Sequence, residues 1–228
     1  FDDELEGPQS PTPAGGWWRR SCVDTCSPST PAFATVSGCS HRDFGNILKT
    51  GIIACTLEPG DQVISARLTG GKDHVIVATN TGKAIVFPED QVRVMGRQAQ
   101  GVRAISLSGK DAVVGMDVIT SPDDYVINLT ELGFGKKTLA DKYPVQKRAG
   151  KGVYTVHITN KTGNLVGIRV VKPTDELIII STSGQIIRIP ATQIRTTSTR
   201  SAQGVRAIRM MKNEKIVDFA LYLGEEDE

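Results

Sequence analysis

The chain has few aromatic residues, few histidines and cysteines, and no long hydrophobic run. Phe, Trp and Tyr make up 5% of its 228 residues, and there are three histidines and four cysteines. No segment is long and apolar enough to cross a bilayer, and the acidic first residues do not resemble a signal peptide. We therefore expect a cytoplasmic protein with no membrane partner.

Residue types used in catalysis and metal binding do not form a recognisable constellation. Cys22 and Cys26 make a CxxxC pair without a second pair of ligands, which is poor support for a zinc site. His41, His74 and His157 lie far apart, and the sequence contains no P-loop and no hydrolytic triad. The expectation is a chain with no catalytic residue, no metal and no cofactor of its own.

What the chain does contain is an internal repeat. Similar segments begin at Asp73, Asp124 and Asp175, each 51 residues after the one before. A second marker recurs at intervals of 50, 51 and 52 residues: GIIACTL at Gly51, GVRAISL at Gly101, GVYTVHI at Gly152 and GVRAIRM at Gly204. Two markers with nearly the same period indicate an array of similar units.

Each unit contains four short strand-like segments. Their apolar runs are rich in β-branched residues, no segment keeps a helical period, and turn sequences such as NTGK and TSGQ separate the first two strands. Repeats of about 50 residues with four strands predict an all-β, propeller-like array of four-stranded blades. We count about four units, of which the first (Ala32 to Gly71) lacks a normal opening hairpin.

Composition divides the chain into three parts. Residues 1–31 are rich in Pro, Gly, Ser and acidic residues and are expected to form a flexible tail. Residues 32–224 carry the repeats, and residues 225–228 form an acidic end. Because the chain begins at Phe1 without an initiator Met, we also expect it to be a piece of a longer protein.

The formal net charge of +2 conceals a basic body. Two of the 27 Lys and Arg residues lie in residues 1–31, as do five of the 25 Asp and Glu residues, and four more acids lie in residues 225–228. Residues 32–224 therefore hold 25 cations against 16 anions, a net charge of +9. A body with this charge favours an extended polyanion such as duplex DNA as its partner.

The cations recur in the polar segment between the second and third strands of each unit. Candidate DNA contacts in these segments are Arg93, Arg97 and Arg103, then Lys142, Lys147, Arg148 and Lys151, then Arg195, Arg200 and Arg206. Lys136 and Lys137, in the GFGKKT hairpin, are secondary candidates. An ordinary solvated surface is the alternative, but it does not explain why the same segment is basic in each unit.

Three long motifs in order resemble the C-terminal domain of the DNA gyrase A subunit. They are FGNILKTGIIACTLEPGDQVI (44–64), TGKAIVFPEDQVRVMGRQAQGVRAISL (81–107) and GFGKKTLADKYPVQKRAGKGV (133–153). The resemblance covers roughly residues 32–224, and it implies a β-pinwheel, a propeller-like fold that wraps duplex DNA.

The signature of that family is a box of the form Q-basic-R-G-G-basic-G. Six positions match it, with Ala149 in place of a glycine: Gln146, Lys147, Arg148, Gly150, Lys151 and Gly152. Two interpretations stay open: this is the family's true box, or it is a copy in a later blade. In either case, glycines allow the backbone N–H groups to approach a phosphate, and the cations supply charge.

The resemblance also implies partners and a role. The domain would bend DNA to support ATP-dependent negative supercoiling by a type II topoisomerase, an isomerase, in the bacterial nucleoid. Its partners would be duplex DNA, the remainder of the gyrase A subunit, and the gyrase B subunit, with ATP and Mg on other parts of the enzyme. The alternatives are the corresponding domain of the topoisomerase IV A subunit and a non-enzymatic propeller-like interaction scaffold, against which the low aromatic content counts.

Overall fold

A computed structural model describes residues 19–25, 33–45, 49–57, 61–211 and 213–222. The expected all-β class is confirmed: the described residues form strands joined by turns and by short 3-10 helices. No helix in this part of the chain has the length and apolar character needed to span a membrane. The 3-10 helices are η1 (His41–Phe44), η2 (Glu89–Gln91), η3 (Ala140–Lys142) and η4 (Ala191–Gln193).

The strands of the described residues form four antiparallel sheets. The first has the order β3 (Gln62–Thr69), β1 (Arg19–Thr25), β2 (Phe33–Ser40), β6 (Val102–Ser106). The second has the order β10 (Val153–Tyr154), β5 (Lys83–Pro88), β4 (His74–Thr79), β7 (Val113–Ile119). The third has the order β11 (Leu165–Val171), β8 (Tyr125–Thr130), β9 (Phe134–Leu139), β14 (Val205–Arg206), and the fourth has the order β13 (Ile186–Pro190), β12 (Glu176–Ser181), β15 (Ile216–Tyr222).

A strand from the following unit completes each of the first three sheets. The Gly-led strands β6, β10 and β14 pair with β2, β5 and β9, each of which belongs to the preceding repeat. The four strands of one sequence repeat therefore do not form one sheet, because the third strand crosses to the neighbouring sheet. This exchange links each unit to the one before it through main-chain hydrogen bonds.

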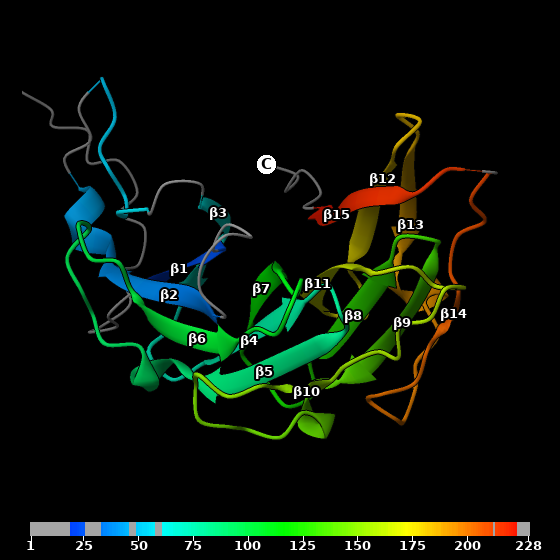
Figure 1. Cartoon of the computed structure of the whole chain (residues 1–228), viewed down its shortest axis with the longest axis horizontal. Helices are drawn as coiled ribbons and strands as arrows, with labels where there is room; N and C mark the ends of the chain where they lie inside the picture. The colour runs from blue at the N-terminus through cyan, green and yellow to red at the C-terminus, as the bar shows by residue number, and fades with distance from the viewer. Residues whose placement is uncertain (1–18, 26–32, 46–48, 58–60, 212, 223–228) are drawn as a thin grey trace, which may run out of the picture.

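The sheets follow one another around an open arc (Figure 1). Strands β3, β7, β11 and β15 lie on its inner side, and β6, β10 and β14 lie at the outer edges of their sheets. Ion pairs join neighbouring inner strands: Arg67 Nε lies 2.8 Å from Asp117 Oδ1, and an Arg169 guanidinium nitrogen lies 3.8 Å from Asp218 Oδ1. The Val170 N–H also donates to Asp117 Oδ2 at 2.9 Å, which ties β11 to β7.

The hydrophobic core lies between successive sheets. In β4, Val75 and Val77 pack toward the first sheet together with Val36, whereas Ile76 and Ala78 pack toward the third. Both faces of the strand are therefore buried, which explains why HVIVAT reads as a continuous apolar run rather than an alternating one.

The opening hairpin of the first unit differs from the sequence expectation. Strand β1 (Arg19–Thr25) pairs with β2 and β3, so a hairpin is present and part of the expected tail is a strand. Residues 1–18, 26–32 and 223–228 lie outside the described residues, so the rest of the tail and the acidic end stay predictions. Within the described part, the fourth sheet is the one with three strands, and no exchanged strand pairs with β13 there.

Strand exchange gives a test with two matched glycines. Gly82 and Gly184 occupy equivalent hairpin turns with φ of +82° and +81°. A Cβ at Gly82 would lie 2.5 Å from the carbonyl oxygen of Val156, which belongs to the incoming chain, whereas a Cβ at Gly184 would meet nothing within 4 Å. We expect Gly184→Ala to cost roughly 1 kcal/mol through backbone strain alone and Gly82→Ala about 2 kcal/mol more through the clash.

Urea denaturation of both variants measures this difference, provided that the m-values stay equal. Equal losses of stability in the two variants would show that the incoming strand does not clash with a side chain at the Gly82 turn.

Candidate nucleic-acid interface

Three segments of the chain follow equivalent paths. Each one leaves its own sheet and runs to the outer edge of the preceding sheet. These crossing segments, residues 89–101, 140–152 and 191–204, each begin with a 3-10 turn and end at the glycine before an exchanged strand. Each donates one main-chain hydrogen bond at the same point to the preceding sheet: Met95 N to Gly38 O (2.8 Å), Gln146 N to Val86 O (2.7 Å) and Thr197 N to Lys137 O (2.9 Å). The crossing segments therefore lie on the outer side of the arc.

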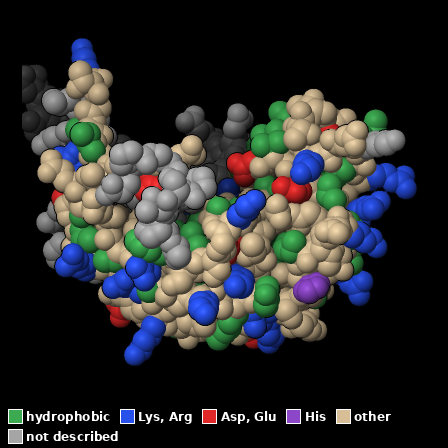
Figure 2. All heavy atoms as spheres, in the orientation of Figure 1, with side chains coloured by type: hydrophobic (Ala, Val, Ile, Leu, Met, Phe, Trp, Pro, Cys, Tyr) green, Lys and Arg blue, Asp and Glu red, His purple; other side chains and the backbone are tan. Residues whose placement is uncertain are grey.

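Six of the cations expected to contact DNA are exposed on the crossing segments and exchanged strands. They are Arg93, Arg103, Lys147, Lys151, Arg195 and Arg206. Lys and Arg side chains line the convex edge of the molecule, below β5 and β10 and beside β14 (Figure 2). The Arg103 guanidinium lies 4.1 Å from the centre of the Phe33 ring, and that of Arg206 lies 5.6 Å from the centre of the Phe134 ring. These aromatic faces restrain two of the cations without neutralising them.

A seventh expected contact, Lys142, is exposed but paired with an acid. Its Nζ lies 2.7 Å from Asp141 Oδ2, and both side chains are open to solvent. The carboxylate offsets the charge of this lysine, so Lys142 is a weaker candidate than the six cations above.

Three other expected contacts are half-buried and bonded to the main chain. The guanidinium groups of Arg97, Arg148 and Arg200 donate to carbonyl oxygens of the preceding unit. Arg148 makes a second such bond, from Nε to the Gln91 carbonyl at 3.0 Å. Part of the donor capacity of these arginines is thus used inside the protein.

The box-like sequence packs against strand β6. The Ala149 N–H donates to the Ala104 carbonyl at 2.7 Å, and the Gly150 carbonyl accepts from the Ser106 N–H at 2.8 Å. A Cβ at Gly152 would lie 2.6 Å from the carbonyl oxygen of Ala84. This glycine is therefore required by close chain packing, and the Ala149 N–H is committed to the protein rather than directed outward.

The secondary candidates for DNA contact, Lys136 and Lys137, do not lie at the surface. Both belong to strand β9 rather than to its turn, and both are buried beneath the crossing segment 191–204. Lys136 Nζ donates to Thr138 Oγ1 and the Thr199 carbonyl, each at 3.3 Å, and to the Arg200 carbonyl. Burial, with a smaller contribution from the Arg200 charge, lowers the pKa of Lys136 to about 8. Lys137 Nζ donates to the Ala191 carbonyl at 3.0 Å, and burial lowers its pKa as well.

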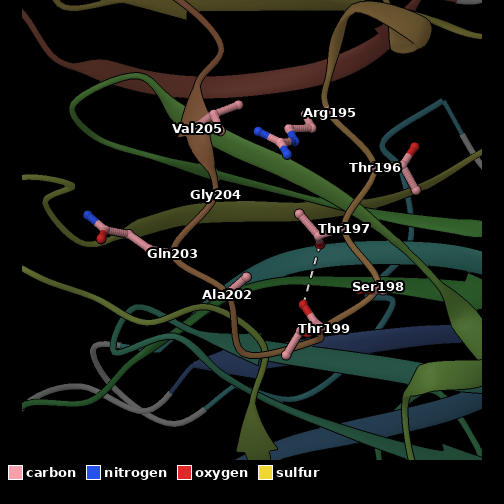
Figure 3. A pocket seen from close by; sticks show the side chains of 9 residues that line it. All are labelled: Arg195, Thr196, Thr197, Ser198, Thr199, Ala202, Gln203, Gly204 and Val205. Atoms are coloured by element: carbon pink, nitrogen blue, oxygen red, sulfur yellow. Dashed lines mark hydrogen bonds between the residues drawn. The ribbon is translucent and has the colours of Figure 1, made fainter.

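A hollow rich in hydroxyl groups was not among the predicted contacts. Residues 195–199 and 202–204 of the third crossing segment, together with Val205 of β14, line a volume of about 360 Å³ (Figure 3). Arg195 and Thr196 to Thr199 line one side of it, and the Thr197 hydroxyl donates to the Thr199 carbonyl at 3.3 Å. Hydroxyl and main-chain N–H groups also bind phosphate, so the run TTST was the signal available in the sequence.

The chain belongs to a family described as the DNA gyrase C-terminal domain, β-propeller. The family model matches residues 41–69, 73–120, 124–172 and 175–221, so three of the four matches begin at the aspartates that open the predicted repeats. The fold inferred from the repeat and the family inferred from the motifs are both confirmed.

Relatives of known name agree with this assignment. The DNA gyrase A subunit of Deinococcus deserti is 37% identical over 204 residues, which cover 86% of this chain and 25% of the relative. The same subunit of Salmonella typhimurium is 37% identical over 186 residues, 82% of this chain and 21% of the relative. The chain thus spans about a quarter of the length of these relatives.

Two solved structures share the fold. A DNA gyrase A C-terminal domain matches with a TM-score of 0.77 and 22% identity, over 91% of this chain and 66% of that one. The C-terminal domain of a DNA topoisomerase IV matches with a TM-score of 0.78 and 22% identity, over 90% of this chain and 61% of that one. The fold therefore does not separate the two enzymes, whereas the family model and the named sequence relatives are those of the gyrase A subunit.

The backbone at Ala149 yields a stability prediction. Its φ is +67°, a left-handed conformation that glycine adopts without strain. We expect Ala149→Gly to stabilise the fold by roughly 0.5–1 kcal/mol, because the relieved strain exceeds the added entropy of the unfolded chain. Ala99 lies in another crossing segment and does not have a positive φ. Ala99→Gly should therefore destabilise the fold. A loss of stability on Ala149→Gly in urea denaturation would contradict this account.

Lys136 predicts a dependence of stability on pH. Because its pKa falls from 10.5 to about 8 on folding, the unfolded chain binds more protons between these values. The free energy of unfolding should therefore rise with pH from about 8 to about 10.5, by at most ~1.4 kcal/mol per pH unit. Other groups titrate in the same range, so the measurement compares wild type with Lys136→Met. The difference between the two curves should follow this slope, and parallel curves would contradict the lowered pKa.

Proposed function

We propose that duplex DNA binds along the convex edge of the arc and bends to follow it. The observation that carries this proposal is the recurrence of exposed cations on three equivalent crossing segments, which succeed one another along a single edge. Exposed Lys and Arg at repeated intervals suit the regularly spaced phosphates of a duplex. Binding of this kind is sensitive to salt and largely independent of base sequence.

Each part of the edge has a distinct task in this proposal. Lys147 and Lys151 neutralise phosphates at the middle crossing segment, and Arg103 adds a planar donor beside them. At the third segment, Arg195 and the neighbouring hydroxyl groups bind the backbone further along. As successive units add contacts, the gain in electrostatic binding offsets the energy of bending the duplex.

In the larger enzyme, this chain would act as the DNA-wrapping part of the gyrase A subunit. The rest of the A subunit, together with the gyrase B subunit, would supply DNA cleavage and ATP hydrolysis with Mg, and the wrapped DNA would support negative supercoiling in the bacterial nucleoid. The 37% identity to named gyrase A subunits favours this role over that of topoisomerase IV. A protein-interaction scaffold is disfavoured because exposed cations recur on all three crossing segments or the strands that follow them.

Salt-dependent binding tests the proposed contacts. We expect Lys147→Gln with Lys151→Gln to weaken binding of the full chain to a random-sequence duplex. The slope of log K against log salt should become shallower by about 1.8, or 0.9 for each lost phosphate contact. Fluorescence anisotropy at several salt concentrations measures both quantities.

The matched control is Lys110→Gln with Lys172→Gln, which removes the same charge from exposed positions next to the inner strands β7 and β11. It should leave the slope nearly unchanged. Equal effects of the two pairs would show that net charge, rather than the convex edge, attracts DNA, and wild type without salt-sensitive binding would overturn the proposed function.

A further inference from the structure

We infer that Arg97, Arg148 and Arg200 are ties between neighbouring units that fix the geometry of the proposed DNA track, rather than phosphate ligands. Each lies four residues before the glycine that opens an exchanged strand. The effect on DNA rests on the proposed function, whereas the tie itself rests on the geometry of the protein.

The three arginines make the same contact. Arg97 Nη1 donates to the Ile53 carbonyl at 3.1 Å, Arg148 Nη1 to the Arg103 carbonyl at 2.9 Å, and Arg200 Nη1 to the Tyr154 carbonyl. Every acceptor lies two residues after the opening glycine of the preceding unit, at Gly51, Gly101 or Gly152. A contact that recurs at equivalent donors and acceptors in three consecutive pairs of units is part of the repeat itself.

Arg148 shows how firmly one tie is held. Its main-chain N–H donates to Gln91 Oε1 at 2.9 Å, and its Nε donates to the Gln91 carbonyl at 3.0 Å. The guanidinium thus bonds to the start of one crossing segment and to strand β6 at once. The fixed fork of an arginine can join two such acceptors, whereas the single ammonium group of a lysine at the same place cannot reproduce that geometry.

The ties and the exposed cations alternate along the same segment. Lys147 and Lys151 are exposed on either side of the half-buried Arg148, and Arg195 and Arg206 are exposed on either side of the half-buried Arg200. Each tie therefore holds the main chain that carries its exposed neighbours at a set position relative to the preceding unit. A positioning residue of this kind determines where phosphates meet the protein and therefore how the DNA bends. It does not change the number of phosphate contacts.

The test separates charge from geometry in the full chain. In Arg148→Lys the charge stays but the tie is lost, so amide hydrogen exchange at Ala149, whose N–H bonds to the Ala104 carbonyl, should accelerate by about tenfold or more. The salt slope of DNA binding should stay that of wild type, while the linking-number shift of nicked circles ligated on the protein should fall. Arg148→Ala should give the same results: faster exchange at Ala149, a smaller linking-number shift and an unchanged salt slope of DNA binding.

Lys147→Ala is the matched comparison and should give the opposite result: normal exchange at Ala149 and a salt slope shallower by about 0.9. Two results would overturn the tie and make Arg148 a phosphate ligand. In the first, Arg148→Lys keeps the wild-type exchange rate at Ala149 and the wild-type linking-number shift. In the second, Arg148→Ala makes the salt slope shallower and Arg148→Lys restores it. If Arg148→Ala does not fold, Arg148→Lys and Arg97→Lys decide the question. Wild type without salt-sensitive binding would remove the proposed function, but the exchange measurement would still test the tie.

Discussion

The exchange of one strand between neighbouring units is the constraint on which the rest of the structure depends. Strands β6, β10 and β14 complete sheets that belong to the preceding repeats. The chain must therefore cross the outer side of the arc before each exchanged strand. The crossing segments lie on the convex edge for that reason, and the glycine at the end of each one lies where the incoming chain meets the backbone of its partner, as Gly152 does at Ala84.

The basic character of the crossing segments has two physical origins. A segment that spans two units needs a side chain long enough to bond to the carbonyl of its neighbour, and Arg148 does so at Arg103. The same segment faces solvent on its other side, where Lys147 and Lys151 are exposed. A count of cations includes both kinds, so the charge of a segment overstates the number of groups that face a ligand.

The sequence was sufficient to predict the class, the repeat and the location of the cations, because strand patterns, turn glycines and charge are properties of short segments. It did not predict strand exchange, since β10 and β14 are short and their partners belong to another unit. The burial of Lys136 was missed for a similar reason. Two of its three acceptors are the carbonyls of Thr199 and Arg200, more than 60 residues away, and main-chain carbonyls leave no trace in a sequence.

Curvature in this molecule is fixed from both sides of the arc. On the inner side, the Arg67–Asp117 and Arg169–Asp218 pairs and the bond from Val170 to Asp117 join successive strands. On the outer side, exchanged strands and arginine ties join the same units. Bending a duplex of 20–30 base pairs by 40–90° costs on the order of 1–6 kcal/mol, so an arc that yielded easily would straighten toward the DNA. An arc restrained on both sides keeps its shape, so in the proposed function it is the duplex that bends to reach all of the exposed cations.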